Sequence, residues 1–209
     1  MPTPRRQKLP IIEFRVSRIY NIQWQRPKEL QDPPPKVEWF RRRKTLEAMW
    51  KKHGRNILQT MSAVTGLPWE EDRIIVYLTW GIISFSDPLT LNLRKDVVMD
   101  FETLTHELIH RISSSPKNQK KIERRWKAFT KKYPKEVPVG INHVPIHAVH
   151  EVMWEKLFPK RVAALAVDIK KAPYIRSWQI VHDLGAAEVV RRVYAPRLPK
   201  NRNSRRVTA

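Results

Sequence analysis

The stretch Thr105-His106-Glu107-Leu108-Ile109-His110 constrains this chain more than any other, because it matches the pattern H-E-x-x-H. On a helix, His106 and His110 lie on one face, about 6 Å apart along the axis at roughly 1.5 Å per residue. This spacing lets two imidazoles bind one Zn²⁺, each at about 2.0–2.1 Å. Zinc lowers the pKa of a water that it binds to about 7, and Glu107 is placed to accept that water's proton. The motif therefore predicts one catalytic zinc ion.

Composition limits which ligands can complete such a site. The chain has 209 residues, of which 41% are hydrophobic, enough for one core. It has no cysteine, so disulfides and thiolate zinc ligands are excluded and any metal must be bound by His, Asp or Glu. The formal net charge of +21 attracts polyanions, most obviously nucleic acid, or an acidic partner.

We expect one folded domain between two basic ends. Residues 1–35 are interpreted as a basic N-terminal arm with a short strand within Ile11 to Tyr20, closed by three prolines at 33–35. Residues 36–195 form the predicted domain, and residues 196–209 a disordered basic tail without acids. No signal peptide or membrane-spanning segment is evident, which favours a soluble, intracellular protein.

The elements ahead of the motif alternate between helix and strand. An amphipathic pattern predicts a helix over Val37 to Lys52, interrupted at Gly54, and a second helix from Ile57 to Gly66. Two β-rich runs follow, Arg73 to Trp80 and Leu89 to Leu93, and the second is interpreted as an edge strand. We therefore expect an α+β fold in which a small mixed or antiparallel sheet with an edge strand packs on several helices.

The motif helix and the helix after it follow this sheet. Asp100 can cap the motif helix, and Ser115-Pro116 is a typical start for the next one. The outer face of that next helix is the densest basic surface of the chain. It can contact a phosphate backbone, although a solvated helix face explains the charge equally well. The candidate nucleic-acid-binding residues are Lys120, Lys121, Arg124, Arg125, Lys127, Lys131 and Lys132.

A third metal ligand has to come from farther along the chain. After a loop at residues 138–140, Pro145 can open a helix that runs to about Phe158. This helix offers Glu151, which we favour, and His147 and His150 as alternatives. Glu155 lies one turn after Glu151, where it can hydrogen-bond the free nitrogen of a ligand histidine. The last predicted helical pattern, from residue 177 to residue 194, surrounds Gly185.

His106-Glu107-x-x-His110 followed by Glu151-x-x-x-Glu155 resembles the gluzincin branch of the zincin metallopeptidases, particularly the compact minigluzincins. In thermolysin-like members the third ligand is a glutamate, and an acid four residues later supports the first histidine. Here His150 stands where these relatives usually have asparagine, and Glu155 where they have aspartate. The gap between the two motifs is also longer, because the basic helix is inserted.

The resemblance implies a zinc endopeptidase with a zincin-like fold and a peptide or protein substrate paired along Leu89 to Leu93. Glu107 would act as general base, and His182 or Tyr174 would stabilise the oxyanion. A related resemblance is to the SprT-like proteases of DNA-bound proteins. They use a third histidine and often carry a cysteine-rich ribbon, which this chain lacks. The alternative is a non-enzymatic basic nucleic-acid-binding or virion-associated protein with a structural or vestigial metal site.

Overall fold

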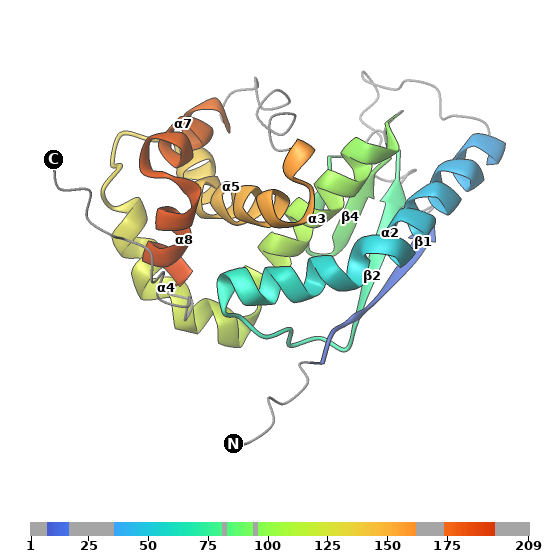
Figure 1. Cartoon of the computed structure of the whole chain (residues 1–209), viewed down its shortest axis with the longest axis horizontal. Helices are drawn as coiled ribbons and strands as arrows, with labels where there is room; N and C mark the ends of the chain where they lie inside the picture. Colours follow the sequence, from blue (N-terminus) through green and yellow to red (C-terminus); the bar gives the residue numbers. More distant parts are fainter. Residues whose placement is uncertain (1–7, 17–35, 81–82, 94–95, 162–173, 195–209) are drawn as a thin grey trace, which may run out of the picture.

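The computed structural model describes residues 8–16, 36–80, 83–93, 96–161 and 174–194, to which the following account refers (Figure 1). These residues form six α-helices, one short 3₁₀ turn at Pro159–Arg161 and one four-stranded sheet. The predicted α+β class with a small mixed sheet is confirmed. None of the described helices combines the length and apolar composition that a membrane crossing needs. The predictions for residues 1–7, 17–35, 162–173 and 195–209 lie outside the described residues.

The sheet has the strand order β1-β2-β4-β3. Strands β1 (Ile11–Val16), β2 (Arg73–Thr79) and β4 (Leu89–Asn92) run parallel, and β3 (Phe85–Ser86) is antiparallel to β4. The pairing of β1 with β2 joins part of the predicted arm to the sheet. The inward side chains of β2 alternate, as expected for a strand with one buried face: Ile74, Val76 and Leu78.

Strand β4 is not the edge strand that its sequence indicated. It lies between β2 and β3, and Phe85 pairs with Thr90 while Ser86 pairs with Leu89. The turn after Ser86 brings the chain back alongside itself, so the short β3 occupies the outer side of β4. A peptide strand could therefore pair with the outer side of β4 only at residues that follow Thr90.

Helix α2 (Lys36–Thr65) is one continuous helix, so the predicted interruption at Gly54 is wrong. Gly54 is buried beneath the indole of Trp50, and a Cβ at this position would lie 2.4 Å from a ring atom. The glycine therefore serves a close approach within the helix. Its general unfavourable effect on helices is outweighed by the packing that it permits.

Helix α3 (Val97–Ser114) carries the H-E-x-x-H motif, as expected. Its N-cap is Asp96, whose carboxylate accepts a hydrogen bond of 2.8 Å from the amide of Val98. The predicted cap, Asp100, lies inside the first turn and is fully buried. The helix packs against α2, β3, β4 and α5, which places the motif between the sheet and the remaining helices (Figure 1).

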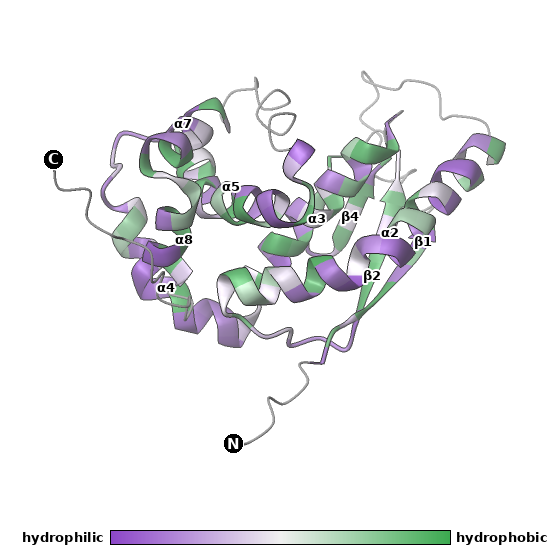
Figure 2. Ribbon diagram, in the orientation of Figure 1, coloured by the Kyte–Doolittle hydropathy of each residue, from purple (hydrophilic) through white to green (hydrophobic). Residues whose placement is uncertain are grey.

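Helix α4 (Pro116–Thr130) starts where Ser115-Pro116 predicted, although the Ser115 hydroxyl bonds Glu70 rather than capping the helix. The buried Asn118 side chain fixes this start by donating to the carbonyls of Pro68 and Ile112 at 2.8 and 2.9 Å. Figure 2 shows α4 as a mostly hydrophilic helix, in agreement with its charged outer face.

Helix α5 (Pro138–Leu157) crosses the middle of the molecule and contacts α2, α3, α7 (Tyr174–Leu184) and α8 (Ala186–Tyr194). The expected start at Pro145 and the expected loop at residues 138–140 are wrong. Pro138 occupies the first turn, and Pro145 lies inside the helix. Gly185, with φ of +81°, separates α7 from α8 in a left-handed conformation that favours glycine.

Candidate metal centre

Three partly buried histidines from two helices lie close together where α3 and α5 pack. His106 and His110 come from α3 and His143 from α5, and one ring nitrogen of each lies within 4.8 Å of the others. The Nε2 atoms of His106 and His110 are 3.1 Å apart. Two nitrogens bound tetrahedrally at about 2.1 Å from zinc would be separated by roughly 3.4 Å. The three side chains are therefore arranged closely enough to bind one metal ion.

The orientation of His143 is fixed by a backbone contact. Its Nδ1 lies 2.6 Å from the carbonyl oxygen of Val139. A carbonyl only accepts hydrogen bonds, so the proton of the neutral ring is on Nδ1 and the lone pair is on Nε2. Such a contact fixes the tautomer and orients a metal-binding histidine. The ring is stacked with His106 and edge-on to His110, with centroid distances of 5.6 and 4.8 Å.

Burial keeps these imidazoles neutral at physiological pH. Burial, and to a smaller extent the nearby His143, lowers the pKa of His110 to about 3. Burial also lowers the pKa of His143, and with the neighbouring histidines it places the pKa of His106 well below the ordinary value. Neutral imidazole is the protonation state that binds a metal, so the three rings are in a binding-competent form.

Glu107 is the acid next to this group. Its side chain is buried at 8% exposure, and burial raises its pKa to about 7. A carboxyl group with this pKa exchanges a proton readily near neutral pH, as general acid–base chemistry requires. A nearby cation would favour its ionised form.

The third member of the group is His143 and not Glu151, the residue favoured from the sequence. Glu151 lies on α5 but is half-buried outside the three close donors. Burial and the exposed Glu155 raise its pKa, and His182 opposes this rise. The sequence reasoning missed His143 because it began the helix at Pro145. The available signal was the spacing i, i+4, i+7 of the histidines at positions 143, 147 and 150.

His147 and His150, the two alternatives, are buried beside the group. Their ring centroids lie 5.5 and 6.0 Å from that of His106. His147 stacks on Trp178 at 4.6 Å, and His150 is edge-on to Trp154 at 4.5 Å. Nδ1 of His147 and Nε2 of His150 have no hydrogen-bond partner within the described part of the chain. Both rings therefore extend the cluster without belonging to its closest set.

The two predicted oxyanion donors occupy different places. Tyr174, at the start of α7, has its ring 4.7 Å from that of His143 and 5.9 Å from that of His147. His182 lies on the same helix but is exposed. Its charge opposes the rise in the pKa of Glu151. Of the two, Tyr174 is the one that the structure places beside the histidine group.

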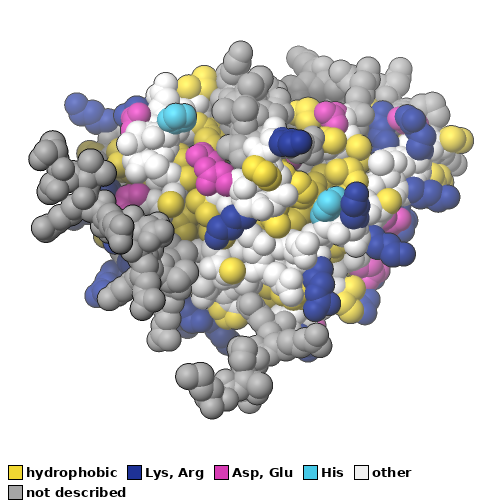
Figure 3. Space-filling model, viewed as in Figure 1, with side chains coloured by type: hydrophobic (Ala, Val, Ile, Leu, Met, Phe, Trp, Pro, Cys, Tyr) yellow, Lys and Arg dark blue, Asp and Glu magenta, His cyan; other side chains and the backbone are white. Residues whose placement is uncertain are grey.

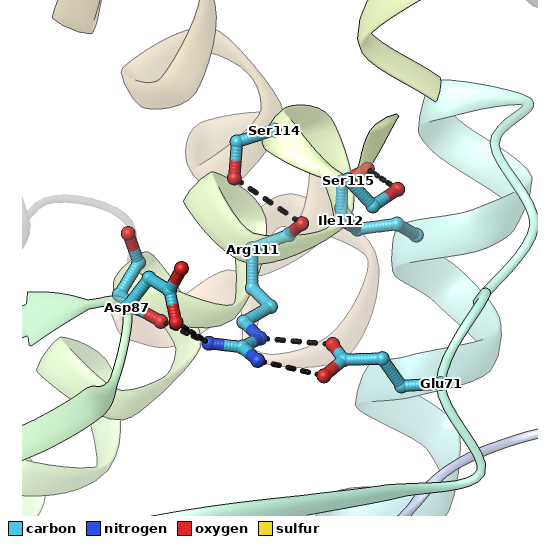
Figure 4. Close-up of polar contacts among 7 residues, drawn as sticks. Glu71, Asp87, Arg111, Ile112, Ser114 and Ser115 are labelled. Carbon is cyan, nitrogen blue, oxygen red and sulfur yellow. Dashed lines mark hydrogen bonds and ion pairs between the residues drawn. The ribbon is translucent and has the colours of Figure 1, made fainter. Parts of the chain in front are cut away.

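The residue after the motif anchors the motif helix. The guanidinium of Arg111 donates to both carboxylate oxygens of Glu71 at 2.7 and 2.8 Å, and to the Ser86 carbonyl and the Asp87 carboxylate at 2.8 Å (Figure 4). At the end of the helix, the Ser115 hydroxyl donates to the carbonyl of Ile112. The Arg111 bonds tie the end of α3 to the chain before β2 and to the β3–β4 turn.

The seven candidate basic residues of α4 divide into two groups. Arg125 is half-buried and donates to the carbonyls of Val193 and Tyr194, and Lys127 forms an ion pair with Glu123. On the face shown in Figure 3, Lys and Arg side chains are spread widely and are not gathered in one patch. The candidates that remain exposed and have no such contact among the described residues are Lys120, Lys121, Arg124, Lys131 and Lys132.

Comparison with models of known protein families, with curated proteins and with solved structures gave no match.

Proposed function

We propose that this protein is a zinc-dependent endopeptidase that binds the metal through His106, His110 and His143. The observation that carries the proposal is the convergence of three neutral imidazole donors within 4.8 Å, with Glu107 next to one of them in the chain. Three protein ligands with a position left for water or substrate are typical of catalytic zinc sites.

In this mechanism the protein supplies the proton transfers. A bound zinc ion would polarise the scissile carbonyl and lower the pKa of water. Glu107 accepts a proton from the attacking water while the oxygen of that water adds to the carbonyl carbon. Glu107 then delivers that proton to the amine nitrogen as the carbon–nitrogen bond breaks. The hydroxyl of Tyr174, from its position beside His143, is our candidate donor to the carbonyl oxygen as negative charge develops there.

With His143 as the proposed third ligand, the SprT-like resemblance supports the proposal better than the thermolysin-like one. The glutamate ligand of thermolysin-like enzymes has no counterpart in the close donor group. A third histidine is instead the arrangement that SprT-like proteases use, although the cysteine-rich ribbon often found with it has no counterpart here. Protein substrates associated with a polyanion would suit the charge of +21.

The variant Glu107→Gln tests the mechanism. We expect it to bind zinc as the parent does and to lose peptide hydrolysis by roughly 10²- to 10⁴-fold, because a neutral amide cannot accept the proton. Hydrolysis of a casein-derived peptide mixture by the zinc-loaded proteins measures the loss, and Glu155→Gln is the control at an exposed position. Equal hydrolysis by Glu107→Gln and the parent would rule out this role.

The second candidate is a non-enzymatic protein that binds nucleic acid, favoured by the exposed basic side chains of α4. In that case the histidine cluster would be structural. Salt-sensitive DNA binding in a protein that retains no zinc would support this candidate over the peptidase.

A further inference from the structure

We propose that the cavity between α3, α4 and α5 binds one unstacked base of a single-stranded nucleic acid, whose phosphates follow a basic row on α4. This inference goes beyond the proposed peptidase function and does not depend on it. The cavity has a volume of about 320 Å³, at the small end of the range for ligand pockets, which suits one base better than a run of stacked bases. His110 belongs both to the cavity lining and to the close donor group, so the base would lie beside the metal centre.

The lining of the cavity is mostly polar but carries little net charge. Only three of the eleven lining residues are apolar. His110 is neutral because burial lowers its pKa to about 3, and the other two ionisable lining residues, Glu123 and Lys127, form an ion pair with each other. Such a surface favours a neutral ligand with hydrogen-bonding groups over an anion or a hydrocarbon chain. The remaining lining residues are neutral and polar: Ser113, Ser114, Gln119, Thr130 and Asn142.

One aromatic ring in the wall gives a base a surface on which to stack. Trp126 is half-buried, and its indole Nε1 donates to Oδ1 of Asn142 at 3.2 Å, so the polar atom of the indole is already satisfied. Tyr194 packs edge-on against the indole with a centroid distance of 6.1 Å, which helps to fix the orientation of the ring. Bases of single-stranded nucleic acids bind proteins by stacking on such rings.

Two amides of the lining can bond the polar edge of the base. The side chain of Gln119 is exposed and has no hydrogen-bond partner among the residues that the structure describes. Asn142 is also exposed, and while its Oδ1 accepts from Trp126, its Nδ2 can donate to a ligand. An amide group both donates and accepts, which matches the mixed donors and acceptors on the edge of a base.

The phosphates of the same strand have a row of basic side chains to follow. Lys120, Arg124, Lys127 and Lys131 recur at i, i+4, i+7 and i+11, which places them on one side of α4. The row is about 17 Å long at roughly 1.5 Å per residue. Lys127 also lines the cavity, and the other three side chains are exposed and form no ion pair within the described part of the chain. A strand along this row would keep its charges in solvent while one neutral base enters the cavity.

Two oligonucleotides with the same number of phosphates test the inference. One is a fluorescein-labelled oligothymidylate, and the other is an oligomer of the same length in which every residue is abasic. Fluorescence anisotropy measures their affinities for the parent, Trp126→Leu and Trp39→Leu. Trp39→Leu is the matched control, because it removes an indole that is also half-buried but lies on α2, outside the cavity lining. Thermal unfolding verifies that both variants are folded.

We expect the parent to bind oligothymidylate roughly 5- to 150-fold more tightly than the abasic oligomer, because stacking adds to the phosphate contacts. Trp126→Leu should bind both oligomers alike, whereas Trp39→Leu should keep the ratio of the parent. Equal affinities of the parent for the two oligomers would overturn the inference. A folded Trp126→Leu variant that keeps the ratio of the parent, or a parent that binds neither oligomer, would also overturn it.

Nuclear magnetic resonance gives a second readout in the parent itself. Oligothymidylate should shift the signal of the Trp126 indole N–H, which is assigned by its loss in Trp126→Phe, and the abasic oligomer should leave the signal in place. A shift with N-acetyl-leucinamide and none with oligothymidylate would identify a pocket for a peptide side chain and contradict the inference. Neither measurement requires hydrolysis, so a failure here is distinguishable from a failure of the proposed peptidase function.

Discussion

At the scale of single residues, the defining feature is a cluster of five imidazoles that burial keeps neutral. Burial is the main reason that the pKa values of His110 and His150 fall to about 3, and the other three histidines shift in the same direction. Without a metal these rings only add desolvated polar surface to the interior. A bound metal ion would compensate that cost.

This protonation behaviour predicts that acid destabilises the metal-free protein. Histidine in the unfolded chain has a pKa of about 6.5, so below that pH the unfolded state binds protons that folded His110 and His150 do not. Each of them should remove up to about 1.4 kcal/mol of unfolding free energy per pH unit below 6.5.

Glu107 changes the free energy of unfolding with pH in the opposite direction to the histidines. Its pKa is raised to about 7 in the folded protein, so its contribution is present in acid and is lost as the pH rises toward 7. The effect of the five histidines exceeds that of this one carboxyl group. Urea unfolding of the metal-free protein should therefore give a lower free energy of unfolding at pH 5.5 than at pH 7. This decrease should be larger in Glu107→Gln. Greater stability of the metal-free parent at pH 5.5 would contradict the assigned protonation states.

At the scale of elements, the Arg111 contacts determine where the end of the motif helix lies. A side chain that is 21% exposed bonds one carboxylate in bidentate geometry and also reaches the β3–β4 turn (Figure 4). Bidentate, charge-assisted bonds to a partly buried carboxylate are stronger than surface ion pairs. These bonds add to the direct packing of α3 against β3 and β4 in holding the motif helix on the sheet.

We predict that Arg111→Met lowers the free energy of unfolding by about 1–3 kcal/mol, because Glu71 would be left without its guanidinium partner. Arg191→Met is the control, since its ion pair with Glu188 is exposed and should contribute less than about 1 kcal/mol. Urea unfolding of both variants measures the difference. Equal losses would show that the Arg111 network is no stronger than a surface pair.

The elements also show what the sequence could predict and what it could not. His106, Glu107 and His110 are close in sequence, so helical spacing alone placed them together. Gly54 was interpreted as an interruption between two helices and Pro145 as the start of one, yet each lies within a helix. At Gly54 the reason is the ring of Trp50, a packing contact that no local propensity reveals.

The error at Pro145 had the larger consequence. A helix that starts there does not include His143, and Glu151 was favoured over His147 and His150 as the third ligand. Which of several polar side chains on one helix faces another helix depends on how the two helices pack. Sequence spacing narrows that choice but does not make it.

At the scale of the whole molecule, the chain carries a net charge of +21, and nine acidic side chains of its described part form ion pairs. Helix α4 packs beside the motif helix α3 and exposes lysine and arginine side chains. This arrangement would bring a polyanion-bound protein close to the metal centre.

We predict that the protein binds duplex DNA with an affinity that falls as salt rises, and that α4 accounts for part of this dependence. Lys120→Gln, Lys121→Gln and Arg124→Gln together should reduce the slope of log affinity against log salt by about one for each phosphate that the variant no longer neutralises. The matched control is an exposed basic group on α2, replaced in the same way: Lys51, Lys52 and Arg55. Fluorescence anisotropy at several salt concentrations gives the slopes, and equal reductions in both triple variants would exclude α4 as the preferred surface.

The most direct test of the account is zinc binding by His143→Ala and Glu151→Ala, measured by calorimetry and by metal content after dialysis. The parent should bind one zinc ion per chain. Removing a partner that only supports a ligand typically costs 10- to 100-fold in affinity, so His143→Ala should lose more than about 100-fold. Glu151→Ala should bind as the parent does. Zinc lost from Glu151→Ala and retained by His143→Ala would contradict the three-histidine centre.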